Sequence, residues 1–252
     1  MNPTTPATAP PDPYAALRLP DFRRYISARA LFSVATQIQG VVVSWQIFAL
    51  TKDPLALGLI GLAEAIPSIT VSLFAGHVAD SVRRKRIVVP AVTVLFLCAV
   101  TLWWLSHPAQ KALLEGGRLH IAAINATVVW PLYLVIFVSG IARGFMSPAL
   151  FAFMPQLLPN RTFLPNAVTW NSTTWQASAV LGPAIGGLLF AHLGLQFAYG
   201  VDTIMEGLAL LLFASIASRE LPPIEGDRLS LSESLTSGIK FIFANQIVLA
   251  AL

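Results

Sequence analysis

Long apolar stretches alternate with short polar ones along this chain, which is typical of a protein that crosses a membrane several times. Each apolar stretch has about 20 residues or more, enough to span a bilayer as a helix. The longest, residues 163–201, is too long for one span, and His192, Gly194 and Gln196 mark its expected turn. The pattern predicts an all-α integral membrane bundle of six transmembrane helices, over residues 30–50, 57–79, 87–105, 126–158, 166–191 and 197–217.

The two ends of the chain depart from this pattern. Residues 1–20 are rich in proline and lack the basic and apolar regions of a signal peptide, so we expect a disordered cytoplasmic tail. The six-helix unit then covers residues 21–218. The polar residues 219–240 predict a cytoplasmic linker between domains that contains an amphipathic helix. Residues 241–252 are largely apolar up to the last residue, which we interpret as the start of a seventh helix in a truncated second half.

Composition and charge agree with a membrane protein. Hydrophobic residues make up 56% of the chain and charged residues only 11%, whereas a soluble domain carries about a quarter. The net charge of +4 does not indicate nucleic-acid binding, because Lys and Arg stand at the ends of apolar runs and form no basic stripe with interleaved aromatics. Most of these Lys and Arg residues fall in the connections on one side of the membrane, which is the side of the N-terminus. The positive-inside rule therefore places the N-terminus in the cytoplasm.

Metal and cofactor chemistry find little support in the sequence. Cys98 is the single cysteine, and the four histidines are scattered without the spacing of metal ligands. No glycine-rich phosphate loop follows a strand, so direct use of ATP is not indicated. We therefore expect no metal and no cofactor, and a lipid bilayer as the main partner.

The turn after the second predicted helix carries a recognisable pattern. Residues 76–86 read GHVADSVRRKR, which resembles the loop signature Gly-x-x-x-Asp-Arg-x-Gly-Arg-Arg/Lys of the major facilitator superfamily. Four residues match that signature, namely Gly76, Asp80, Arg84 and Lys85, whereas Ser81 and Arg83 depart from it. The resemblance implies a conformational-switch loop that helps to lock two transporter halves together. Without the resemblance, the same residues are a basic cytoplasmic loop that obeys the positive-inside rule.

Two further segments carry the same resemblance. In the fifth predicted helix, residues 182–187 resemble the antiporter motif Gly-Pro-x-x-Gly-Gly of the superfamily, matched by Gly182, Pro183, Gly186 and Gly187. Arg143 in the fourth helix is another feature of proton-coupled antiporters in the superfamily. Residues 45–51, 53–67 and 166–176 are similar to the subgroup that contains the enterobactin exporter and the transmembrane secretion effectors.

This resemblance implies an architecture and a function. The chain would be the N-terminal half of a twelve-helix transporter, built from two inverted three-helix repeats, in the inner membrane of a bacterium. Its partner would be the missing C-terminal half or a second copy. The implied function is proton-coupled efflux of a small molecule, such as a siderophore or a drug-like compound, by alternating access. The alternatives are a non-transporting membrane protein, either a structural partner or a membrane-embedded enzyme, and an inactive transporter fragment; no convergent set of side chains indicates an enzyme.

The few charged residues inside the predicted helices are candidates for this function. A charge in lipid costs several kcal/mol unless it is paired or faces water. Arg143 is a fixed positive charge that could bind an anionic substrate or act on a carboxylate. Glu64, Glu206 and Asp202 could bind protons, and the last two share one face of the sixth helix. The alternatives are a structural ion pair for Arg143 and neutral, hydrogen-bonded carboxyls for the others.

Polar strips on two helices are candidates for the lining of an aqueous cavity. Gln39 and Gln46 share a face of the first helix, and Asn171 and Trp175 share a face of the fifth. Such strips either line a water-filled cavity or make hydrogen bonds between helices, and the sequence leaves both interpretations open.

Overall fold

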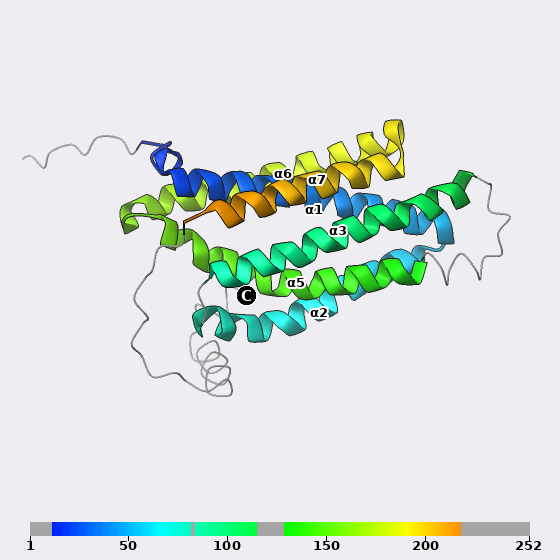
Figure 1. Cartoon of the computed structure of the whole chain (residues 1–252), viewed down its shortest axis with the longest axis horizontal. Coiled ribbons are helices and arrows are strands. Elements are labelled where there is room, and N and C mark those ends of the chain that lie inside the picture. The colour runs from blue at the N-terminus through cyan, green and yellow to red at the C-terminus, as the bar shows by residue number, and fades with distance from the viewer. Residues whose placement is uncertain (1–11, 82–83, 115–128, 218–252) are drawn as a thin grey trace, which may run out of the picture.

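Six long helices run along one axis of the molecule (Figure 1). The structure is a computed structural model, and it describes residues 12–81, 84–114 and 129–217, without the side chains of 73–74, 76–81 and 108–114. Every long helix contains a stretch that is long and apolar enough to cross a membrane, which confirms the predicted six-helix bundle. The helices are α1 (Pro20–Thr51), α2 (Pro54–Ser81), α3 (Lys85–Leu114), α5 (Trp130–Phe153), α6 (Leu164–Leu193) and α7 (Leu195–Ser215).

Local backbone chemistry explains several helix ends. Pro20 stands in the first turn of α1, where its missing N–H is not needed. Lys52 adopts a left-handed conformation at φ 54° and ends α1. Gly194, at φ 83°, separates α6 from α7 at the turn that the sequence predicted, because glycine carries no Cβ to oppose a positive φ. By contrast, α1 begins at Pro20 rather than at residue 30, so charged residues that were expected to precede the helix lie on it.

The packing of the helices reveals an internal symmetry. The main contacts join α1 to α6 and α7, α5 to α2 and α3, and α3 to α7. Exchanging α1 with α5, α2 with α6 and α3 with α7 turns α1–α6 into α5–α2 and α1–α7 into α5–α3, and it maps α3–α7 onto itself. Because three spans separate equivalent helices, the second triplet crosses in the opposite direction to the first. The bundle is therefore two inverted three-helix repeats.

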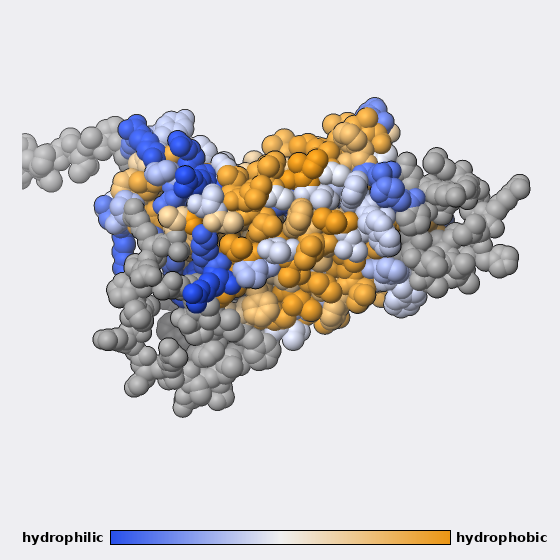
Figure 2. All heavy atoms as spheres, in the orientation of Figure 1, coloured by the Kyte–Doolittle hydropathy of each residue, from blue (hydrophilic) through white to orange (hydrophobic). Residues whose placement is uncertain are grey.

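The face of the molecule shown in Figure 2 has a broad apolar band between two more polar ends. Large side chains such as Leu62 on α2, Leu134 on α5 and Leu211 on α7 are more than half exposed. An exposed apolar surface of this extent suits lipid, since a soluble monomer rarely shows a continuous one. The chain is thus a multi-pass membrane protein.

Two buried apolar clusters lie at different heights of the bundle. One includes Phe22, Leu95, Leu150 and Phe213, and the other includes Ile38, Ile47, Leu102, Leu132 and Tyr199. On α7, Asp202 and Glu206 fall between Tyr199 of one cluster and Ala209 of the other. The interior is therefore apolar at both levels, with polar side chains enclosed between them.

Glycines set the closest helix approaches. A Cβ at Gly144 of α5 would lie 2.8 Å from the carbonyl oxygen of Ser68 on α2. A Cβ at Gly182 of α6 would overlap Gln37 of α1, and one at Gly186 would lie 3.1 Å from Ile38 Cα. These contacts are at two pairs of helices, α2 with α5 and α1 with α6, that the internal symmetry relates. Small residues four apart thus bring the backbones together, as in many membrane helix pairs.

The N-terminal segment packs on the bundle before α1 begins. The 3-10 helix η1 (Ala16–Arg18) contains Ala16, which is fully buried. Asn166 of α6 donates from Nδ2 to the Pro13 carbonyl at 2.6 Å and accepts from the Ala16 N–H at 3.0 Å, and Trp170 donates to the same Pro13 carbonyl. Disorder was expected over residues 1–20, so residues 12–20 are more ordered than anticipated. Residues 1–11 and the predicted linker and seventh helix, from residue 218 onward, lie outside the described residues.

The two ends of the glycine motif in α6 should respond differently to added volume. Gly182→Ala is expected to destabilise the bundle by about 1–3 kcal/mol, because the new Cβ overpacks against Gln37 of α1. Gly187→Ala is the matched control, since nothing lies within 4 Å of a Cβ there. It should leave stability unchanged or raise it by up to about 1 kcal/mol through helix propensity. SDS-induced unfolding of the purified protein, followed by circular dichroism, measures both. Equal effects of the two variants would contradict this packing.

Candidate functional site

A chain of four polar side chains crosses the middle of the bundle. Arg143 of α5 forms an ion pair with Glu64 of α2 through Nη1 and Oε1. The second terminal nitrogen of Arg143 donates to Gln39 Oε1 of α1 at 2.7 Å. Gln39 in turn donates from Nε2 to Asp202 Oδ2 of α7 at 3.4 Å. One guanidinium is therefore connected, directly or through Gln39, to side chains of three other helices.

Two glycines allow Arg143 to reach its partner. Gly140 and Gly144 flank it on α5, and a Cβ at Gly140 would lie 2.6 Å from the Glu64 carbonyl oxygen. Because α5 and α2 touch at this point, the Arg143 guanidinium lies within ion-pair reach of the Glu64 carboxylate. Pairing with Glu64 neutralises Arg143 and lowers the free-energy cost of placing its charge inside a membrane bundle.

Accessibility changes steadily along this chain of contacts. The Glu64 side chain is 37% exposed and that of Arg143 is 18% exposed. Gln39 is 5% exposed, and Asp202 and Glu206 are fully buried. The site therefore connects an accessible carboxylate at one end with enclosed carboxyls at the other.

Glu206 lacks any hydrogen-bond partner for either carboxyl oxygen, and Asp202 Oδ1 is also without one, among the described residues. The two residues share a face of α7, as the i, i+4 spacing predicted. An ionised carboxylate in such a dry place is costly, and two close together are more so. This arrangement makes the two carboxyls candidates for the proton exchange that is proposed below.

Three of the four predicted cavity residues are buried in this conformation, Gln39 among them. Gln46 is fully buried and accepts a hydrogen bond at 2.6 Å from the hydroxyl of Tyr199, itself fully buried on α7. Asn171 is 6% exposed, whereas Trp175 on the same helix is 47% exposed. The structure thus favours the interhelical alternative for Gln46 and leaves Trp175 accessible.

The switch-loop candidates divide between described and undescribed positions. Lys85, the first residue of α3, donates from Nζ to the carbonyls of Ala214 at 2.7 Å and Ile216 at 2.6 Å. This places a cation on the carbonyls that end α7, where the helix dipole is negative. Arg84 directly precedes α3 and is half-buried. Gly76 and Asp80 lie on α2, where the surroundings of the first and the side chain of the second are outside the described part.

Some members of this site were not anticipated from the sequence. Tyr199 pairs with Gln46 although 153 residues separate them in the chain, and no local pattern indicates that contact. Gly140 and Gly144 carry a usable signal, since small residues four apart beside an intramembrane arginine predict a close helix approach. Among the described residues, no group of His, Cys, Asp and Glu could hold a metal ion.

Comparison with known proteins supports a transport role. A family model described as transmembrane secretion effector matches residues 11–251. The enterobactin exporter EntS of Shigella boydii serotype 18 is 27% identical over 237 residues, which cover 91% of this chain and 50% of the relative. EntS proteins of Escherichia coli O1:K1 and O139:H28 show the same identity and coverage. The chain therefore spans about half the length of these curated relatives.

Removing the central bridge should weaken the bundle. Gln39→Leu leaves Arg143 Nη2 and Asp202 Oδ2 without their partner, so we expect a loss of about 1–2 kcal/mol in stability. Gln176→Leu on α6 serves as the control, since Gln176 is exposed and makes no hydrogen bond to the described residues. Unfolding in SDS measures both variants. A Gln39→Leu protein as stable as Gln176→Leu would show that the bridge contributes nothing.

Proposed function

Because the chain belongs to the transmembrane secretion effector family of the major facilitator superfamily, we propose that it forms one half of a proton-coupled small-molecule exporter. The chain covers about half of each curated relative, so the other half of the transport pathway comes from further polypeptide or from a second copy. The substrate path lies between the two halves near the bilayer midplane, and rocking of one half against the other gives alternating access.

The observation that carries this proposal is the polar chain from Glu64 through Arg143 and Gln39 to Asp202, with Glu206 beside it. Arg143 keeps its proton under all physiological conditions, so it serves as the fixed charge. It pairs with Glu64 and is connected to Asp202 through Gln39, and Glu206 lies one turn further along α7. Three carboxyls therefore compete for the Arg143 guanidinium. Protonation of one of them changes which of the others Arg143 pairs with, and this links proton binding to the arrangement of the helices.

The coupling step follows from this competition. The structure contains the ion pair between Arg143 and Glu64 and the packing of α5 against α2, and we assign these contacts to the state in which Glu206 is protonated. Loss of the Glu206 proton creates a buried anion that attracts Arg143 toward α7 and weakens its pairing with Glu64. The α2–α5 contact then loosens, and the accessible Glu64 becomes free to bind a proton or a cationic substrate. Proton movement and helix movement are linked in this way.

The substrate class is a siderophore or a drug-like compound. The matched relatives are named enterobactin exporters, and we extend that class to this chain as part of the proposal. We also place the protein in the inner membrane of a bacterium, with the end of the bundle that carries η1 facing the cytoplasm, because Arg18, Arg23 and Arg24 gather there.

Replacing Glu206 should uncouple transport from the proton gradient. In inside-out vesicles from cells that express the protein from its complete gene, uptake of enterobactin and of ethidium is measured with and without a pH gradient. Glu206→Gln cannot exchange a proton, so we expect the stimulation by the gradient to fall about tenfold or more for whichever compound is transported. Asp53→Asn is the control, because Asp53 lies in the exposed α1–α2 turn and its cap on the Leu55 N–H survives the change.

A companion variant makes the coupling test decisive. Glu64→Gln removes the carboxylate that pairs with Arg143 and should likewise reduce the stimulation by the gradient. If Glu64→Gln and Glu206→Gln both keep the coupling of the unmodified protein, the polar chain does not mediate proton exchange. If neither compound moves with any gradient, the export proposal itself fails for this substrate class.

The orientation can be measured separately. In a Cys98→Ser background, Lys52→Cys in the α1–α2 turn should react with a membrane-impermeant maleimide in intact cells. Arg161→Cys, in η4 (Arg161–Phe163) before α6, should react only after the membrane is permeabilised. These sites lie at opposite ends of the bundle, because an odd number of spans separates them. Reversed labelling would place the N-terminus outside the cytoplasm.

A further inference from the structure

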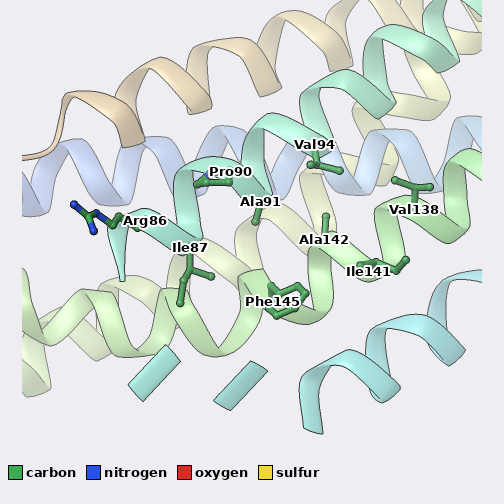
Figure 3. Close-up of a pocket in the computed structure, with 9 residues that line it drawn as sticks. All are labelled: Arg86, Ile87, Pro90, Ala91, Val94, Val138, Ile141, Ala142 and Phe145. Carbon is green, nitrogen blue, oxygen red and sulfur yellow. The ribbon is translucent and has the colours of Figure 1, made fainter. Parts of the chain in front are cut away.

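A surface groove of about 380 Å³ runs between α3 and α5 (Figure 3). Ala91 of α3 and Ala142 of α5 are nearly buried and form its floor. Val94, Val138 and Phe145 form part of the walls, and Arg86 lies at one end. The groove exists because two small side chains meet where the neighbouring positions carry large ones.

This groove is separate from the polar site. Successive residues of an α-helix are about 100° apart around the axis. Phe145, two residues after Arg143, therefore faces nearly the opposite side of α5. Arg143 points to α1 and α2 inside the bundle, so the groove opens on the outer surface that faces lipid. It plays no part in the proposed coupling.

The charged end of the groove carries Arg86, a cation without a partner in the part of the chain that the structure describes. Arg86 is exposed and makes no hydrogen bond or ion pair to any described residue. The preceding Lys85 is already engaged with the carbonyls that end α7. Apart from Arg86, all described residues that line the groove are apolar. The described lining therefore carries one charge, the guanidinium at the end of an apolar channel.

We propose that this groove binds an anionic glycerophospholipid of the surrounding bilayer. From Arg86 to Val94 the helix rises about 12 Å, so an acyl chain can lie along the alanine floor while its phosphate meets the guanidinium at the end. Basic pockets between transmembrane helices bind anionic head groups in this manner. Arginine suits the role because its planar fork matches phosphate oxygens.

Lipid titration of the purified chain in detergent, read by native mass spectrometry, tests this proposal. The probes are phosphatidylglycerol and phosphatidylcholine with identical acyl chains. We expect phosphatidylglycerol to bind more tightly, and Arg86→Gln to weaken its binding about fivefold, the effect of about 1 kcal/mol per basic residue at a lipid surface. Val94→Trp fills the groove and should reduce binding of both lipids. Val94 is 37% exposed, so the larger side chain does not disturb the core.

Arg161→Gln is the matched control, because Arg161 is an exposed basic residue that does not line the groove. Binding unchanged by Arg161→Gln but reduced by both Arg86→Gln and Val94→Trp supports the site. An equal loss of phosphatidylglycerol binding in Arg161→Gln and Arg86→Gln would show that the effect comes from general surface charge, and it would overturn the proposed site. Normal binding by Val94→Trp would also overturn it. A photoreactive residue in place of Val138 that captures residues 219–252 of the chain instead of lipid would assign the groove to that segment.

Discussion

The cost of a permanent positive charge inside a membrane bundle governs much of this structure. Arg143 cannot release its proton, so it must find anionic or polar partners within reach. It obtains them from α2 and α1, through Glu64 and Gln39. These contacts demand a particular rotation of α5 and a close approach to α2. The glycines at 140 and 144 permit that approach because any Cβ there would meet the backbone of α2.

The apolar parts of the bundle serve the same arrangement. One buried cluster lies on each side of the polar chain, so water is kept from the enclosed carboxyls of Asp202 and Glu206. Hydrogen bonds and ion pairs are stronger in such surroundings, and an unpaired charge is correspondingly more expensive. Stability and proton binding therefore depend on the same enclosure. Glu206 is buried without a hydrogen-bond partner among the described residues, so its ionisation would lower stability. In the proposed coupling, this cost is what drives the change of conformation.

The two functional features of the molecule face opposite directions. The polar chain points from α5 into the bundle, toward α1, α2 and α7. The apolar groove lies on the outer side of the same helix and meets lipid. The helix α5 thus contributes to both the polar chain and the groove. Each feature needs only three or four residues per two turns, which form one face of the helix. Because of this separation, we expect the proposed lipid binding and the proposed proton coupling to respond independently to mutation.

The sequence by itself determined the all-α class, the six spans, the turn at Gly194 and the pairing of Asp202 with Glu206 on one face. These depend on length, hydropathy and the helical repeat, which are local properties. It misjudged the start of α1, because a helix that extends beyond the apolar stretch looks like a polar connection; Arg29 on that extension lies 5.9 Å from the Phe151 ring. Only the tertiary structure decided that Gln39 joins Arg143 to Asp202 and that Gln46 pairs with Tyr199. Those contacts depend on the rotation and height of helices far apart in the chain, and hydropathy contains no information about either.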